Sequence, residues 1–155
     1  MRRLIASVPL ILLAAGNVGA QESRATFGLG RNDTSSLALS LNWHAAPFHA
    51  GLGWAGGLWV TSRGAGWIGG GLAYTHQFAG GPVFVRGAVM PGLYRSGSDV
   101  NLGGPLQFLS RVEIGTELSN RGQISLAFEH RSNAGLYATN PGLNTVSVNY
   151  SLPLN

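Results

Sequence analysis

His130 and Ser132 lie two residues apart in the last quarter of the chain. A neutral imidazole can take the proton of a serine hydroxyl, which turns that hydroxyl into a nucleophile. Residues at alternate positions of a β-strand share one face, so a strand here would set the two side chains side by side. Ile124, Leu126 and Phe128 precede them on the same face and are all apolar. The pattern predicts a serine esterase site that continues an apolar stripe, as an enzyme acting on lipid requires.

Two further groups would complete such a site. A third polar side chain usually fixes the tautomer of the imidazole, and Asn144 begins the next alternating segment with the parity that faces His130. The developing oxyanion needs hydrogen-bond donors, which Asn133 and the backbone amides of Ala134 and Gly135 can supply. A histidine and a serine at this spacing also occur by chance at strand ends. The residues alone therefore leave open a structural role for the pair.

The elements that must position this motif are β-strands. Apolar and polar residues alternate along the chain in segments of about ten residues, the length that a tilted strand needs to cross a bilayer. The expected strands are residues 24–31, 35–43, 51–62, 67–78, 82–94, 106–118, 123–132 and 144–152. Charged residues make up only 10% of the chain, against about 25% in an ordinary soluble domain. We predict an all-β fold, an eight-stranded antiparallel transmembrane β-barrel of the outer membrane.

The first twenty residues have the pattern of a signal peptide. A basic start at Arg2 and Arg3 precedes an apolar run that is too short to span a bilayer, and small residues follow at Val18-Gly19-Ala20. We expect a signal peptide at residues 1–20 and one barrel domain at residues 21–155. Without the leader the formal charge falls from +4 to +2, which disfavours a nucleic-acid partner.

Charges within the expected strands indicate which face points inward. Arg86, Arg111, Glu113, Glu117, Glu129 and Arg131 all fall on the polar parity. An arginine turned toward lipid costs about 2–4 kcal/mol at the bilayer midplane, so these side chains should pair inside the barrel. Glu129 is therefore expected to be an interior carboxylate, although it adjoins His130.

The other histidines do not indicate a metal site. Cysteine is absent, and the spacing of His44, His49 and His76 matches no ligand set, so no metal and no cofactor are expected. His44 and His49 flank an expected inner turn, which predicts solvated loop residues. His76 lies on the apolar parity of its strand, which predicts an interfacial or packing role.

Residues Glu129–Leu136, followed by Asn140–Asn144, resemble the terminal segment of the outer-membrane lipid A 3-O-deacylases, the PagL family. The resemblance implies Ser132 as the nucleophile, His130 as its base, and Asn133 with Gly135 at the oxyanion hole.

The resemblance also reveals one departure. The family carries a glutamate as the third member of its catalytic triad, and the corresponding place in this chain is that of Asn144. An amide can hold the tautomer of the imidazole but cannot stabilise an imidazolium by charge. The substitution therefore leaves three alternatives for this chain: slower turnover, a shifted pH optimum or a degenerate enzyme.

These features predict hydrolysis of the ester-linked acyl chain at position 3 of lipid A, with release of a 3-hydroxy fatty acid. If odd-numbered strands run outward, His130 and Ser132 face lipid near the outer leaflet, where lipopolysaccharide is the expected partner. Arg31, Arg63, Arg95 and Arg131 end the outward strands. Arg63 and Arg95 are candidates to bind lipid A phosphates, with an ordinary solvated rim as the alternative. A phospholipid esterase, a non-catalytic structural or adhesive barrel, and a homodimeric assembly stay open.

Overall fold

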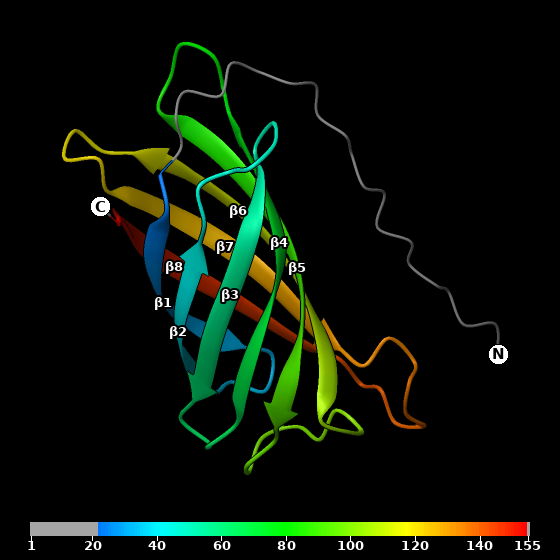
Figure 1. Cartoon of the computed structure of the whole chain (residues 1–155). Coiled ribbons are helices and arrows are strands. Elements are labelled where there is room, and N and C mark those ends of the chain that lie inside the picture. Colours follow the sequence, from blue (N-terminus) through cyan, green and yellow to red (C-terminus); the bar gives the residue numbers. More distant parts are fainter. Residues whose placement is uncertain (1–21, 155) are drawn as a thin grey trace, which may run out of the picture.

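The computed structural model describes residues 22–154 and is a closed barrel of eight antiparallel strands (Figure 1). The strands are β1 (Arg24–Asn32), β2 (Leu37–His44), β3 (Leu52–Thr61), β4 (Gly66–Gln77), β5 (Val83–Arg95), β6 (Leu106–Glu117), β7 (Gln123–Ser132) and β8 (Leu143–Pro153). Each strand pairs with the next along the chain, and β8 closes the barrel on β1. The predicted signal peptide lies outside the described residues. No helix within residues 22–154 is long and apolar enough to cross a membrane.

The period-two pattern of each strand places its apolar residues outside. On β2, Leu37, Leu39 and Leu41 are exposed, whereas Ala38 and Asn42, at the alternate positions, are buried. An outward apolar band with a packed interior is the arrangement that lets a small barrel reside in lipid. The predicted fold class is confirmed, and the predicted strand bounds agree with the observed ones to within two residues.

The two ends of the barrel differ in their connections. The turns after β4 and β6 are short, whereas residues 96–105 after β5 and 133–142 after β7 form long loops. The loops after β3, β5 and β7 lie together at the lower end in Figure 1. We call this end the outer end, because long loops face the exterior in barrels of this kind.

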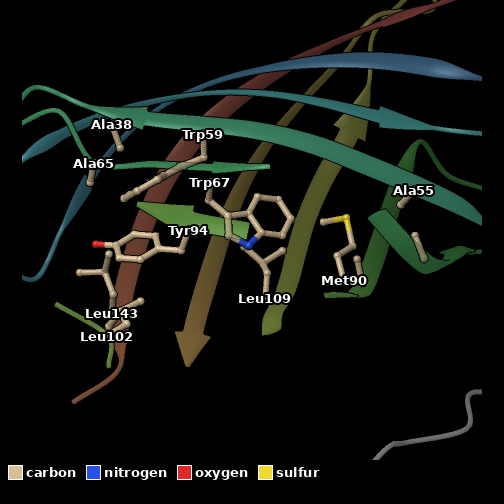
Figure 2. Close-up of a cluster of buried hydrophobic side chains, with 12 residues drawn as sticks. Ala38, Ala55, Trp59, Ala65, Trp67, Met90, Tyr94, Leu102, Leu109 and Leu143 are labelled. Carbon is tan, nitrogen blue, oxygen red and sulfur yellow. The ribbon is translucent and has the colours of Figure 1, made fainter. Parts of the chain in front are cut away.

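An apolar cluster fills the interior near the outer end. Figure 2 shows Trp59, Trp67 and Tyr94 packed with Leu109, and Leu102 reaches the same cluster. Leu102 belongs to the β5–β6 loop and is fully buried. The hydroxyl of Tyr94 donates a hydrogen bond of 2.7 Å to the carbonyl of Val100 in that loop. This loop therefore folds back over the mouth of the barrel and is held there by packing.

Charged side chains pair across the interior. Arg86 contacts Glu113 at 3.2 Å, and Arg111 contacts Glu113 at 3.1 Å and also pairs with Glu129. Arg131 completes the chain of ion pairs with a contact of 2.7 Å to Glu129. The predicted interior role of Glu129 is confirmed, because its carboxylate is 2% exposed and its two partners are both interior arginines.

One prediction about an individual residue is wrong, and a second residue confirms only one of the two places expected for it. His44 is not a solvated loop residue but the last residue of β2, and it is buried with no hydrogen bond to either ring nitrogen. Arg131 was expected on the inward parity and also ends an outward strand; the inward placement is confirmed, since its guanidinium lies inside the barrel at 4.2 Å from the ring centre of Trp59. In both cases the parity of the strand, and not its proximity to an end, decides where the side chain points. His49 is exposed, and His76 packs edge-on against Phe78, as expected.

Candidate active site

The register of β7 with its two neighbours sets the surroundings of the predicted base. His130 lies opposite Asn144 on β8 and opposite Ser110 on β6, while Ser132 lies opposite Phe108. Directly opposed residues of antiparallel strands share a face, so these side chains emerge together on the outer surface of the barrel. This surface continues into the exposed apolar residues of β7, among them Phe128. The site therefore opens toward lipid at the outer end.

The structure brings His130 and Asn144 into direct contact. The distance from Nδ1 of His130 to Oδ1 of Asn144 is 2.7 Å. Since an amide oxygen can only accept, Nδ1 must carry the proton and Nε2 must present its lone pair. A ring in this tautomer is ready to act as a general base through Nε2.

Ser132 lies beside the base without bonding to it. Among the hydrogen bonds of residues 22–154, none joins the Ser132 hydroxyl to the imidazole of His130. Catalytic hydrogen bonds are often long or misaligned in a free enzyme and tighten when substrate binds. A rotation about the Cα–Cβ bond of Ser132 is the smallest movement that would change the position of its hydroxyl.

The donors expected at the oxyanion hole are mostly engaged with the loops. The side-chain amide of Asn133 is fully buried and donates to the carbonyls of Leu102 and Thr139, at 2.7 Å each. The amide of Gly135 donates to Oδ1 of Asn133 at 2.9 Å. Asn133 thereby ties the β5–β6 loop to the β7–β8 loop. In the described part of the chain, the backbone amide of Ala134 has no protein partner. Among the free donors, it is the nearest to Ser132 in sequence.

Two hollows of the barrel lie away from this site. A polar hollow of about 380 Å³ lies at the inner mouth, and a mainly apolar one of about 480 Å³ lies beside β3, β4 and β5; neither is lined by His130 or Ser132. Arg63 and Arg95 are exposed at the outer end, and Arg95 borders the second hollow. Residues 22–154 contain no cluster of acidic, histidine or cysteine side chains arranged to hold a metal ion.

Residues 21–153 match the family model of the lipid A 3-O-deacylases (PagL). The chain belongs to this family. The resemblance predicted from the segment around His130 is thereby confirmed, and the protein is an outer-membrane enzyme of the hydrolase class.

Individual relatives agree with the family assignment. The lipid A deacylase PagL of Pseudomonas aeruginosa is 26% identical over 175 aligned positions, which cover 99% of this chain and 100% of the relative. The crystal structure of the outer membrane enzyme PagL superposes with a TM-score of 0.73 at 21% identity, covering 84% of this chain and 99% of the other. The barrel of Neisserial surface protein A (NspA) reaches a TM-score of 0.58 at 12% identity, over 88% of this chain and all (100%) of that one. At these identities the structural matches show the fold alone.

Two residues at this PagL-family site were not singled out for a role by the sequence. Asp33, from the β1–β2 turn, accepts a hydrogen bond of 3.0 Å from the side-chain amide of Asn144. Gly142, in the β7–β8 loop, has a φ of 75° and lies against the ring of His130. A Cβ at position 142 would lie 2.9 Å from Cε1 of His130. Asp33 lies outside the segments that carry the family resemblance, and Gly142 lies within one of them without a role of its own. Both contacts depend on how loops approach the strand, which the sequence pattern does not describe.

Replacement of Gly142 by alanine is expected to lower kcat by about tenfold or more, since the new methyl group must displace the imidazole from Asn144. Left-handed backbone strain at a non-glycine residue costs about 1–2 kcal/mol. Gly64→Ala is the matched control, because Gly64 has a φ of 78° and a Cβ added there would meet no atom within 4 Å. Steady-state kinetics and urea unfolding of both variants separate the effects. Equal losses of activity in the two variants would mean that strain, and not contact with His130, is responsible.

Proposed function

We propose that this protein hydrolyses the ester-linked acyl chain at position 3 of lipid A by a serine-esterase mechanism and releases a 3-hydroxy fatty acid. The observation that carries the proposal is the 2.7 Å contact between His130 and Asn144, on the lipid-facing surface directly beside Ser132. Membership of the lipid A 3-O-deacylase family supports the choice of substrate.

The proposed reaction has two halves. The hydroxyl oxygen of Ser132 attacks the ester carbonyl while Nε2 of His130 takes its proton. The tetrahedral intermediate collapses, the 3-hydroxyl oxygen of the sugar leaves with that proton, and the acyl chain stays on Ser132. Water then attacks the acyl-enzyme with His130 again as the base, which releases the fatty acid and restores the serine. Asn144 orients the ring throughout.

The oxyanion is proposed to be held by the segment Asn133–Gly135. The Ala134 amide is free in the described structure, so it can serve directly. The donors of Asn133 and Gly135 can join it only by exchanging their present loop partners when substrate binds.

Arg63 and Arg95 are proposed to bind the phosphates of lipid A at the outer rim. Both guanidinium groups are exposed there, and a planar guanidinium suits a phosphate in a bidentate contact. A homodimer stays a prediction.

Mass spectrometry of the products tests the substrate. The purified barrel, refolded in detergent, is incubated with lipid A and, separately, with a glycerophospholipid that carries no 3-hydroxyacyl group. Loss of one 3-hydroxyacyl chain from lipid A with no fatty acid from the phospholipid is the expected result. Release from the phospholipid alone would favour the phospholipid esterase. No release from either lipid by a correctly folded protein would favour a non-catalytic barrel.

A further inference from the structure

Three hydrogen bonds join Asp33 to Asn144. Its carboxylate oxygen Oδ2 accepts from the backbone amide of Asn144 at 3.1 Å and from the side-chain amide at 3.0 Å. In return, the backbone amide of Asp33 donates to the carbonyl of Asn144 at 3.0 Å. The β1–β2 turn is thus fastened to the start of β8 at the residue that holds His130.

This contact determines which way the side chain of Asn144 points. A carboxylate has no donor, so only the NH₂ end of the Asn144 amide can face Asp33. The oxygen must then face His130, and the ring must place its proton on Nδ1. The charge of Asp33 therefore fixes both the orientation of the amide and the tautomer of the histidine.

The turn that carries Asp33 is braced from the opposite side of the barrel mouth. The side-chain amide of Asn32 donates to Asp99 at 3.1 Å, and the hydroxyl of Thr34 donates to the same carboxylate. Partial burial raises the pKa of Asp99, but hydrogen bonds from the β1–β2 turn outweigh this effect and hold that pKa below its ordinary value. A charged Asp99 therefore fixes the turn on both sides of Asp33 before substrate arrives.

We infer that Asp33 is a positioning residue that selects the Nδ1–H tautomer of His130 through the Asn144 amide and supplies the negative charge that Asn144 lacks. The inference rests on the proposed function, because it presumes that His130 is the base. Hydrogen bonds in a chain polarise one another, so a carboxylate behind an amide strengthens the acceptor that faces the imidazole. When the ring becomes an imidazolium, that charge stabilises it across the amide.

The first test is Asp33→Asn. The new side chain can still accept from the backbone amide of Asn144, so the local fold is retained, but its NH₂ group now permits the Asn144 side chain to turn around. We expect kcat to fall by about tenfold, because the lost charge is exposed and acts through one intervening group. A charge that only repels anionic lipid A would act differently. Its removal would lower KM and leave kcat unchanged, and this result would overturn the inference.

The second test exchanges the two groups. In the double variant Asp33→Asn with Asn144→Asp, the carboxylate accepts directly from Nδ1 of His130, and the new amide at position 33 donates to that carboxylate. The site then holds the same carboxylate and the same amide in exchanged places. If the fall in kcat of Asp33→Asn reflects charge and orientation, the double variant should recover most of that kcat. If kcat stays as low as in Asp33→Asn, the carboxylate is needed at position 33 for another reason and the inference fails.

A spectroscopic readout separates this inference from the proposed function. Nitrogen-15 NMR of the refolded protein, with His130→Gln for assignment, reports which ring nitrogen carries the proton. The wild type should show the Nδ1–H form, and Asp33→Asn should show a mixture. An unchanged tautomer in the variant contradicts the inference, whether or not lipid A is hydrolysed. Absence of deacylation by the wild type contradicts only the proposed function.

Discussion

Ser132→Ala is expected to lower the release of 3-hydroxy fatty acid from lipid A by a factor of about 10³ or more, while the barrel folds normally. The hydroxyl is the only group removed, and it makes no hydrogen bond within the described residues, so the fold loses little. The residual rate comes from substrate binding and the oxyanion donors alone. Mass spectrometry of lipid A from cells that express each protein, with membrane insertion verified, gives the comparison.

Ser110 provides the decisive control for this experiment. It lies on β6 directly opposite His130 and is exposed on the same face, so it offers a second hydroxyl to the same imidazole. Ser110→Ala should retain most of the activity if Ser132 is the nucleophile. The reverse result, with Ser110→Ala inactive and Ser132→Ala active, would move the nucleophile to β6 and retire the proposed mechanism.

The sequence predicted the barrel because strand parity is a local property. Side chains alternate strictly along a strand, so Leu37, Leu39 and Leu41 indicate an outward face without any knowledge of the partner strand. The same parity assigned Glu129 to the interior and placed His130 and Ser132 together on the outside. The contact between His130 and Asn144 also followed from local information, because the two strands are joined by one loop.

Contacts between segments that are distant in sequence could not be predicted from strand parity. Asp33 meets Asn144 across 111 positions of sequence, and only the closure of β8 on β1 brings them together. Gly142 reaches the ring of His130 through the path of a long loop, which no periodicity describes. His44 was misplaced, and Arg131 was associated with the outer rim as well as with the interior, for a related reason. Both residues lie close to strand ends, which suggested contact with solvent. At the outer mouth, a folded-back loop and a packed core cover Arg131. The strand parity of His44 turns its side chain into the barrel.

Removal of the interior carboxylate in Glu129→Ala is expected to destabilise the barrel by about 3–5 kcal/mol, because it leaves the buried Arg131 without its acidic partner and removes one of the two carboxylates that pair with Arg111. Glu129 accepts hydrogen bonds from Arg111 and from Arg131, and both guanidinium groups are 1% exposed. The loss of Glu129 would add to a hydrogen bond that Arg131 already lacks, because its Nε has no partner. Urea unfolding of the refolded protein measures the loss.

Glu117→Ala is the matched control for burial. Glu117 pairs with Arg24 at 3.1 Å near the inner end, but its side chain is 35% exposed, so its loss should cost about 1 kcal/mol or less. Equal costs for the two alanine variants would mean that water reaches the interior pairs and screens them. If Glu129→Ala does not fold, Glu129→Gln keeps the shape and part of the hydrogen bonding. That variant should retain deacylase activity, because position 129 faces away from Ser132, and a folded but inactive Glu129→Gln would instead make the interior carboxylate part of the catalytic machinery.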